Sequence, residues 1–270
     1  MTCFSRVLMR SFVGLVFIFL IAPLVTVVST SFSDSAVLAF PPSGFTLKWY
    51  RSISPEFWAA LRVSLIVSTS TTAIAVVAGT AASLALVRGR FPGRVILSAY
   101  CMSPLMVPSL VIGVAAFQFA SRIWDWTGYS LMGSMLGLVL GQSAFTIPFV
   151  IRSAIAGQAH LDRTVEEAAM NLGASPAQTF FRVTLPMLLP GVISGAVFAF
   201  VMSFDDVPIA LFLGGGDATT FPVKIYTSVE FNFDADLMAV STIVVACSLV
   251  VMTIVERLIG IDKLLGGARG

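Results

Sequence analysis

The chain has 270 residues, of which 57% are hydrophobic and only 11% are charged. In an ordinary soluble domain about 25% of the residues are charged. This composition excludes a typical soluble globular domain and indicates a membrane protein with several spans.

Six charge-free stretches are long enough to cross a bilayer as helices, which takes about 20 apolar residues each. In chain order they are residues 11–33, 63–87, 95–121, 126–151, 183–204 and 237–255. Backbone groups inside a bilayer need internal hydrogen bonds, which makes helices the expected form, and the sequence lacks the alternating polarity of a β-barrel. The sequence therefore predicts an all-α membrane protein with six transmembrane helices in a single domain, residues 1–270.

The first span follows Arg6 and Arg10, an arrangement that is also typical of a secretory signal peptide. Its apolar core runs from Phe12 to Val28, whereas the apolar part of a signal peptide has about 7–15 residues. No small-residue cleavage site follows the apolar core. We expect a retained helix, with a signal peptide as the alternative.

Small and polar residues are frequent within the second span, at 68–72 and 79–83. Such residues let neighbouring helices approach closely and form hydrogen bonds across their interface. Prolines that would each permit a kink interrupt several spans: Pro23, Pro104, Pro108, Pro148 and Pro190. The pattern fits ordinary helix packing and also fits a bundle that changes shape around a pathway.

The distribution of basic residues predicts the orientation in the membrane. With the N-terminus in the cytoplasm, eleven of the sixteen Lys and Arg residues fall in cytoplasmic segments, and nine of the fourteen acidic residues fall outside. Both termini are therefore predicted to be cytoplasmic. The segment 152–182, between the fourth and fifth spans, becomes a cytoplasmic loop.

This loop carries the sequence marks of two short helices. Thr164 and Glu167 have the spacing of a capping box, and Gly173 can end the helix in the left-handed conformation. Ser175 to Gln178 then form a second capping box, with Pro176 at the first helical position. The sequence predicts two helices joined at Gly173, which form a protruding elbow.

The first of these helices has an apolar face, made by Leu161, Val165, Ala168, Ala169 and Leu172. One interpretation is an amphipathic segment that lies on the lipid surface, but such segments are rich in Lys and Arg. Here Arg163 and Arg182 stand against three acidic residues. The balance favours a surface that docks on a partner.

Asp205 and Asp206 follow the fifth span directly. Carboxylates at a membrane boundary are costly unless they face water or a partner. Such a pair could line a substrate pathway and attract a cationic solute. Alternatively, one of the two caps a helix or pairs with Lys224.

Other chemistry is not supported by the sequence. The three cysteines, Cys3, Cys101 and Cys247, are placed in predicted helices or at the cytoplasmic end, and a lone His160 cannot build a metal site. No phosphate-binding loop of the G-x-x-x-x-G-K-[ST] type is present, because none of the lysines follows a glycine. We expect no metal, no cofactor, no catalytic residues and no ATP hydrolysis by this chain.

Glu167-Ala168-Ala169, with Gly173 and Leu185-Pro186 downstream, resembles the EAA motif of bacterial ABC-importer inner-membrane permeases of the binding-protein-dependent type. In that family the motif forms a coupling helix that enters a groove on a cytoplasmic ATPase. Leu185 and Pro186 would start the next spanning helix. The resemblance implies a type I importer fold and these ATPase-coupling residues: Glu166, Glu167, Ala168, Ala169, Gly173, Ala174, Leu185 and Pro186.

Three further stretches resemble the spermidine/putrescine permeases, namely 44–50, 203–206 and 221–226. This resemblance implies transport of a polyamine or a similar small cation. Permeases for iron(III), thiamine, opines and aminophosphonates share similar stretches and remain alternatives. A stand-alone secondary transporter is a further alternative, although paired intramembrane charges and an inverted repeat would be expected there.

The resemblance also implies partners and a location. The expected partners are a second permease subunit, identical or homologous, two cytoplasmic ATP-binding subunits, a periplasmic substrate-binding protein and the lipid bilayer. No nucleic acid is expected. The expected location is the bacterial inner membrane, as a multi-pass protein.

Overall fold

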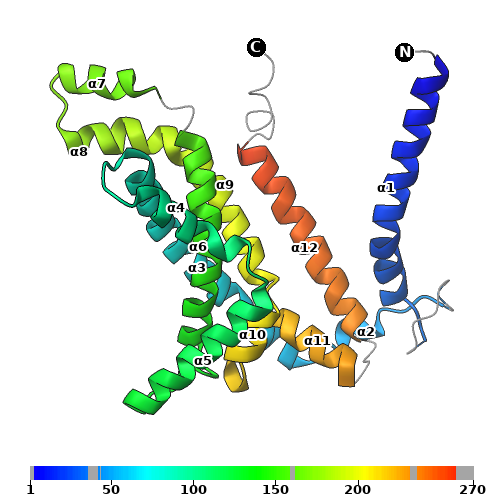
Figure 1. Cartoon of the computed structure of the whole chain (residues 1–270). Helices are drawn as coiled ribbons and strands as arrows, with labels where there is room; N and C mark the ends of the chain where they lie inside the picture. The colour runs from blue at the N-terminus through cyan, green and yellow to red at the C-terminus, as the bar shows by residue number, and fades with distance from the viewer. Residues whose placement is uncertain (1–2, 36–41, 43, 159–161, 232–235, 260–270) are drawn as a thin grey trace. The chain divides into compact units, whose positions relative to one another are not determined.

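The computed structural model describes residues 3–35, 42, 44–158, 162–231 and 236–259 (Figure 1). All regular structure in these residues is helical, which confirms the predicted all-α class. In chain order the helices are α1 (Cys3–Ser31), α2 (Lys48–Arg51), α3 (Pro55–Arg88), α4 (Arg94–Met102), the 3-10 helix η1 (Ser103–Leu105), α5 (Ser109–Thr127), α6 (Met135–Gln158), α7 (Arg163–Asn171), α8 (Pro176–Thr179), the π-helix η2 (Phe180–Thr184), α9 (Leu185–Phe204), α10 (Pro208–Leu213), the 3-10 helix η3 (Gly216–Ala218), α11 (Phe221–Phe231) and α12 (Asp236–Ile259).

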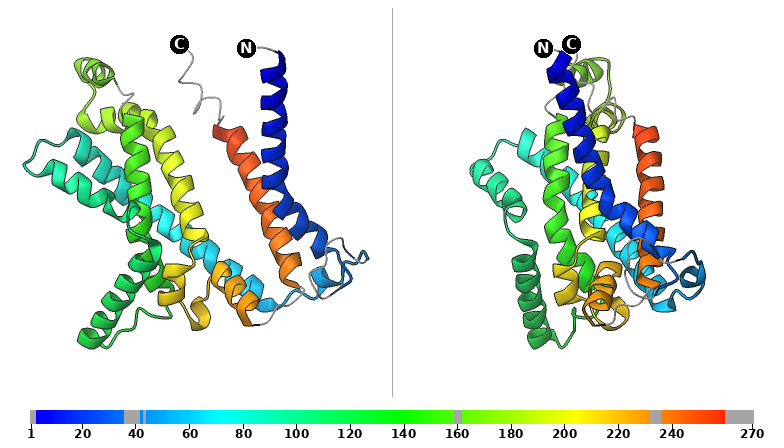
Figure 2. Two further views of the ribbon diagram at one scale, coloured as in Figure 1. Left: turned by 45° about the vertical axis from the view of Figure 1, so that its right-hand side comes forward. Right: turned by 90° about the vertical axis from the view of Figure 1, so that its right-hand side faces the viewer.

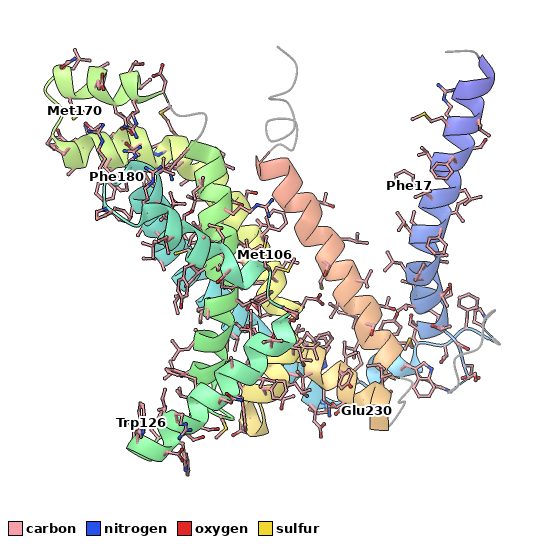
Figure 3. The ribbon with its side chains drawn as sticks, viewed as in Figure 1. Phe17, Met106, Trp126, Met170, Phe180 and Glu230 are labelled. Carbon is pink, nitrogen blue, oxygen red and sulfur yellow. The ribbon has the colours of Figure 1, made fainter. Side chains whose placement is uncertain are left out.

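The chain divides into two compact units. The terminal unit comprises residues 1–57 and 227–270, and the central unit comprises residues 58–226. In the terminal unit α1 packs along α12 (Figure 2). The side chains of Phe12 and Phe17 on α1 are exposed, and Figure 3 shows Phe17 projecting from the helix. A lipid bilayer would surround this apolar surface, as the first predicted span requires.

In the central unit the most extensive helix contact joins α6 and α9, and the next joins α5 and α10. The core of this unit includes Val67 of α3, Leu138 of α6 and Ile209 of α10, which are fully buried. Small residues bring the helices together. A Cβ atom on Gly79 would lie only 2.7 Å from Cβ of Val150 on α6, so the small residues of the second span support close packing as predicted.

Four helical segments in the described residues are long and apolar enough to cross a membrane: Leu8–Ser31, Pro55–Arg88, Met135–Gln158 and Pro176–Phe204. The bent pair Arg94–Leu105 and Ser109–Thr127 would make a fifth span, and Asp236–Val250 is a shorter apolar helix. The six-helix arrangement and the cytoplasmic location of the termini remain predictions.

The predicted continuous span at 95–121 is broken in the structure. α4 continues into η1, which ends at Leu105, and α5 begins at Ser109. The helical segments before and after this break are bent by 103°. Pro104 has no N–H for the carbonyl of Tyr100, and the hydroxyl of Ser103 donates to that carbonyl instead, at 2.8 Å. Pro108 then removes a second donor, and the helix restarts after it.

The predicted fourth span, 126–151, begins too early. Residues 126 and 127 belong to the end of α5, a turn follows, and α6 runs from Met135 to Gln158. The hydroxyl of Ser134 accepts a hydrogen bond from the N–H of Gly137 at 3.1 Å and so caps the start of α6. The uncharged stretch 126–151 contains the end of α5, a turn and most of α6, and no charged residue separates them.

The predicted orientation can be tested by thiol labelling of intact cells. In a variant with Cys3, Cys101 and Cys247 replaced by serine, single cysteines at Arg90 and Asn171 are expected to be protected from a membrane-impermeant maleimide. A cysteine at Asp217 is expected to react, because this residue is exposed in the connection that follows α10. All three should react after the membrane is permeabilised, and labelling of Asn171→Cys in intact cells would contradict the orientation.

Candidate functional site

The predicted elbow is formed by α7 and α8, at one end of α6 and α9 (Figures 1 and 2). α7 begins two residues earlier than a Thr164 cap would allow. Asp162 is its N-cap, and its side chain accepts a hydrogen bond from the N–H of Thr164 at 2.9 Å. That backbone bond lowers the pKa of Asp162, and its negative charge favours this end of a helix. The predicted box of Thr164 and Glu167 is therefore wrong, although the helix itself is present.

Gly173 ends α7 as predicted. Its φ of +89° lies in the left-handed region, where a residue without Cβ is unstrained. The N–H of Ala174 donates to the carbonyl of Ala169 at 3.1 Å, and the N–H of Gly173 donates to the carbonyl of Met170 at 2.9 Å. These two bonds make a Schellman motif, which closes the helix and turns the chain toward α8.

The second predicted capping box is confirmed. Ser175 and Gln178 exchange hydrogen bonds between side chain and backbone, with Pro176 at the first turn of α8. α8 does not end before the next helix but continues through the π-helix η2 into α9. Pro186 lacks an N–H for the carbonyl of Arg182, and a π turn is one way in which a helix accommodates such a gap. Leu185 does start α9 as predicted, although the continuous helix already begins at Pro176.

The elbow exposes apolar side chains. Leu172 at its tip is 89% exposed, and Val165 and Met170 on α7 are 44% and 45% exposed. Figure 3 shows Met170 projecting from α7. Part of the predicted apolar face is thus present but uncovered, while Leu161 and His160 lie outside the described residues. An exposed apolar tip at the end of a short ordered helix is suited to insertion into a groove of a partner protein.

The predicted coupling residues do not all have the same surroundings. Glu167 and Ala168 are exposed on α7, Ala169 and Ala174 are half-buried at the turn, and Pro186 is exposed on α9. Glu166 differs from its neighbour because its carboxylate points into the protein. The elbow therefore has an outer surface around Glu167 and Leu172 and an inner contact at Glu166.

At the inner contact, Glu166 binds side chains from two other helices. The guanidinium of Arg88, the last residue of α3, donates to both of its carboxylate oxygens, at 3.1 and 2.6 Å. The hydroxyl of Thr184, at the end of η2, donates to one of these oxygens at 2.5 Å. Burial opposes ionisation of Glu166, but the bonds from Thr184 and Arg88 outweigh it and lower its pKa. Neither Arg88 nor Thr184 is among the predicted coupling residues, and their contacts with Glu166 join positions that are 78 and 18 residues apart in the sequence.

Asp205 and Asp206 lie at the opposite end of the central unit, between α9 and α10. The structure separates the two residues. Asp205 is exposed, whereas Asp206 is only 6% exposed and accepts a hydrogen bond from the N–H of Ala210 at 3.1 Å. This contact supports the predicted alternative in which one of the pair stabilises the start of a helix.

Asp206 lies beside buried polar side chains. The hydroxyl of Ser203 donates to Gln142 Oε1 on α6 at 2.5 Å. Burial raises the pKa of Asp206 to about 6, against the effects of the N–H groups of Ala210 and Ile209 and of the Gln142 side chain, which favour the charged form. The Asp206 carboxyl group therefore titrates at a higher pH than an ordinary aspartate.

The raised pKa of Asp206 predicts a pH-dependent stability. The folded protein binds more protons than the unfolded chain between the ordinary value of 3.8 and about 6, so its free energy of unfolding falls as the pH rises through that window. Two pKa units correspond to about 3 kcal/mol. Asp206→Asn retains an oxygen acceptor but cannot titrate. Denaturation in detergent at pH 4 and pH 7 should show a smaller pH effect in this variant than in the original protein, and equal pH effects would contradict the assignment.

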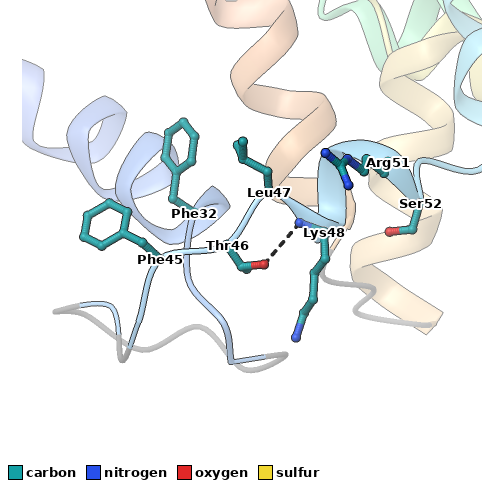
Figure 4. Close-up of a pocket in the computed structure, with 7 residues that line it drawn as sticks. All are labelled: Phe32, Phe45, Thr46, Leu47, Lys48, Arg51 and Ser52. Atoms are coloured by element: carbon teal, nitrogen blue, oxygen red, sulfur yellow. Dashed lines mark hydrogen bonds between the residues drawn. The ribbon is translucent and has the colours of Figure 1, made fainter.

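The terminal unit contains an open pocket of about 750 Å³ (Figure 4). Its lining residues are Phe32, Phe45, Thr46, Leu47, Lys48, Arg51 and Ser52. The ammonium group of Lys48 is bound to the Asp34 carboxylate at 2.6 Å, and the ring N–H of Trp49 donates to the carbonyl of Ser33 at 2.8 Å. Lys48 and Trp49 thus attach the stretch 44–50 to the end of α1. These contacts account for the polar groups of both side chains.

Comparison with known proteins gives consistent matches to one family. Residues 73–261 match the family described as the binding-protein-dependent transport system inner membrane component. The putrescine transport system permease protein PotI of Escherichia coli K12 is 32% identical over 231 residues, which cover 84% of this chain and 82% of that protein. The spermidine/putrescine transport system permease protein PotC of the same organism is 29% identical over 267 residues, 97% of each chain.

Among solved structures, a chain of a bacterial ABC transporter involved in the import of the acidic polysaccharide alginate matches with a TM-score of 0.72. The match covers 95% of this chain and 98% of that chain, at 17% sequence identity. At this identity the likeness shows the fold alone, and it agrees with the predicted type of importer bundle.

Proposed function

This chain belongs to the family of binding-protein-dependent transport system inner membrane components, and from this premise we propose how it works and what it transports. It is a multi-pass inner-membrane permease subunit of an ABC importer, and hydrolysis of ATP belongs to a separate subunit. In the proposed mechanism, the elbow of α7 and α8 docks on a cytoplasmic ATPase subunit and transmits its closure to the membrane helices.

One observation carries this docking proposal, namely the exposed apolar tip of an otherwise well-capped elbow. Leu172 is 89% exposed although both helices beside it are fixed by backbone and side-chain hydrogen bonds. A rigid element loses little conformational entropy when it binds, and a few buried anchor residues contribute most of the affinity of many interfaces. Leu172 is the anchor in this proposal, with Glu167 and Ala168 beside it.

The proposed cargo is a polyamine or a similar small cation. This assignment is supported by the names of the relatives PotI and PotC and by the exposed carboxylate of Asp205 at the end opposite the elbow. A carboxylate near a narrow pathway attracts cations by lowering the local electrostatic potential. Iron(III), thiamine, an opine or an aminophosphonate remain alternative cargoes.

The proposed assembly contains a second permease subunit, identical or homologous, two ATP-binding subunits and a periplasmic substrate-binding protein. This chain and its partners can be reconstituted in proteoliposomes with ATP inside. Uptake of labelled putrescine and spermidine should exceed uptake of iron(III), thiamine and an aminophosphonate. If one of the other solutes is taken up and both polyamines are not, the cargo proposal is wrong while the permease assignment stands.

Neutralising Asp205 tests its place on the pathway. Asp205→Asn keeps the size and hydrogen-bonding capacity of the side chain but removes the attraction for a cation, worth about 1 kcal/mol for charges that are exposed to water, or roughly a fivefold loss of uptake. Because Asp205 is exposed, the amount of protein in the membrane should not change. The comparison variant is Asp206→Asn, whose effect is expected on stability. Normal uptake in Asp205→Asn would show that this residue does not attract the cargo along the pathway.

A further inference from the structure

The contact around Glu166 joins three helices at the elbow end of the central unit. Glu166 belongs to the first turn of α7, Arg88 ends α3, and Thr184 leads into α9. The two bonds from Arg88 are bidentate, and such pairs of guanidinium and carboxylate fix orientation as well as distance. We refer to Arg88, Glu166 and Thr184 as the latch.

The latch is more shielded from solvent than an ordinary surface ion pair. The side chains of Arg88 and Glu166 are 32% and 15% exposed, and Thr184 is 2% exposed. Exposed ion pairs contribute little to stability, whereas a shielded, bidentate pair with a third donor is a stronger link. The next residue, Glu167, points outward, because successive side chains on a helix are about 100° apart.

Nearby polar contacts bind the same helix ends. The side-chain amide of Gln158, the last residue of α6, donates to the hydroxyl of Ser83 on α3 at 3.0 Å. A small cavity of about 30 Å³ lies between Val87, Arg88, Gln158, Arg163 and Glu166. The end of α6 is thus tied to α3, and the latch ties α3 and the start of α9 to α7.

We propose that Glu166 does not contact the ATPase but is a positioning residue that fastens the elbow to α3 and α9, so that movement of the docked elbow reaches both membrane helices. This proposal rests on the proposed function of the elbow. The adjacent carboxylates then have separate roles: Glu167 faces the partner, and Glu166 holds the elbow to the membrane helices. Without the latch the elbow still docks, but its movement is no longer passed on efficiently.

The test separates docking from transmission. The complete importer, with its companion permease, ATPase and binding protein, is purified and reconstituted with the variants Glu166→Gln, Arg88→Gln and Thr184→Val. Three quantities are measured: the ATPase retained on the permease, ATP hydrolysis in the presence of the loaded binding protein, and solute taken up per ATP hydrolysed. Arg90→Gln is the matched control, because Arg90 is an exposed arginine two residues beyond the latch.

For Glu166→Gln and Arg88→Gln we expect normal retention of the ATPase and a roughly tenfold loss of uptake per ATP, since a hydrogen-bonded pair with a charged group contributes about that factor. Thr184→Val keeps the shape of the side chain and should show a smaller loss in the same direction. The exchanged pair Arg88→Glu with Glu166→Arg should recover part of the uptake per ATP, which a general loss of folding would not do. Arg90→Gln should behave as the original protein.

Two outcomes would overturn the proposal. In the first, Glu166→Gln lowers the amount of ATPase bound to the permease, but the complexes that still hold the ATPase show unchanged uptake per ATP. This result would make Glu166 a docking residue. In the second, all three quantities are normal in Glu166→Gln and Arg88→Gln. If the original permease itself retains no ATPase, the proposed function of the elbow fails instead, and this result is distinct from both.

Discussion

Replacing Gly173 by valine is expected to reduce uptake about tenfold. With φ at +89°, a β-branched residue at this position is strained by about 1–2 kcal/mol, and the two bonds of the Schellman motif are weakened. The tip that carries Leu172 then loses its fixed position relative to α8. The measurement is uptake in proteoliposomes together with the amount of ATPase that remains bound.

The matched control is Gly173→Asn, because asparagine adopts the left-handed conformation more readily than other residues. A Cβ atom at this position would meet nothing within 4 Å, so the two variants differ in backbone strain and not in crowding. Gly173→Asn should retain most of the uptake. Equal losses in both variants would show that bulk at the docking surface, and not the turn, is limiting.

Gly191→Leu in α9 is expected to destabilise the packing of the central unit. A Cβ atom on Gly191 would lie 2.8 Å from the carbonyl oxygen of Ser153 and 3.1 Å from Cα of Gly157, both on α6. These are backbone atoms of a helix, so the side chain can be accommodated only if α6 and α9 separate. Overpacking of this kind costs about 1–3 kcal/mol and occasionally more. The thermal midpoint and the yield of monodisperse protein in detergent should both fall.

Gly14→Leu in α1 is the control for this prediction. A Cβ atom at Gly14 would have nothing within 4 Å, so leucine there adds apolar surface in a predicted membrane span without crowding. The yield and midpoint should stay close to those of the original protein. A Gly191→Leu protein as stable as Gly14→Leu would mean that α6 and α9 are not in the contact described above.

The elbow could be predicted in detail because its determinants are local. Gly173 and the Ser175–Gln178 capping box act within a few residues of each other, and each dictates backbone geometry by itself. The error at the start of α7 has the same origin. Asp162 and Thr164 are both good N-cap residues, and sequence alone does not decide which one the helix selects.

The limits of the membrane spans were less predictable. The length and hydrophobicity of an apolar stretch do not predict the bend of 103° between the two helices that meet near Pro104 and Pro108. The turn between α5 and α6 is also uncharged, so the predicted fourth span included it. Polar residues that satisfy backbone groups, such as Ser103 and Ser134, mark both boundaries.

Contacts between distant segments could not be read from the sequence. Glu166 and Arg88 are 78 positions apart, and Glu166 was grouped with Glu167 because it directly precedes the motif that Glu167 begins. The different surroundings of Asp205 and Asp206 depend likewise on Gln142 of α6 and on the start of α10. In both pairs of acids, tertiary packing turns one carboxylate inward and leaves the other exposed.

The central claim is that the elbow contacts the ATPase, and photo-crosslinking from its tip tests it most directly. A benzophenone amino acid is placed at Leu172 in the assembled importer, and a control is placed at Asp217, which is exposed at the opposite end of the central unit. Irradiation should join position 172 to the ATP-hydrolysing subunit, identified by mass spectrometry, and should not join position 217 to it. Crosslinks from 217 to the ATPase, with none from 172, would contradict the account.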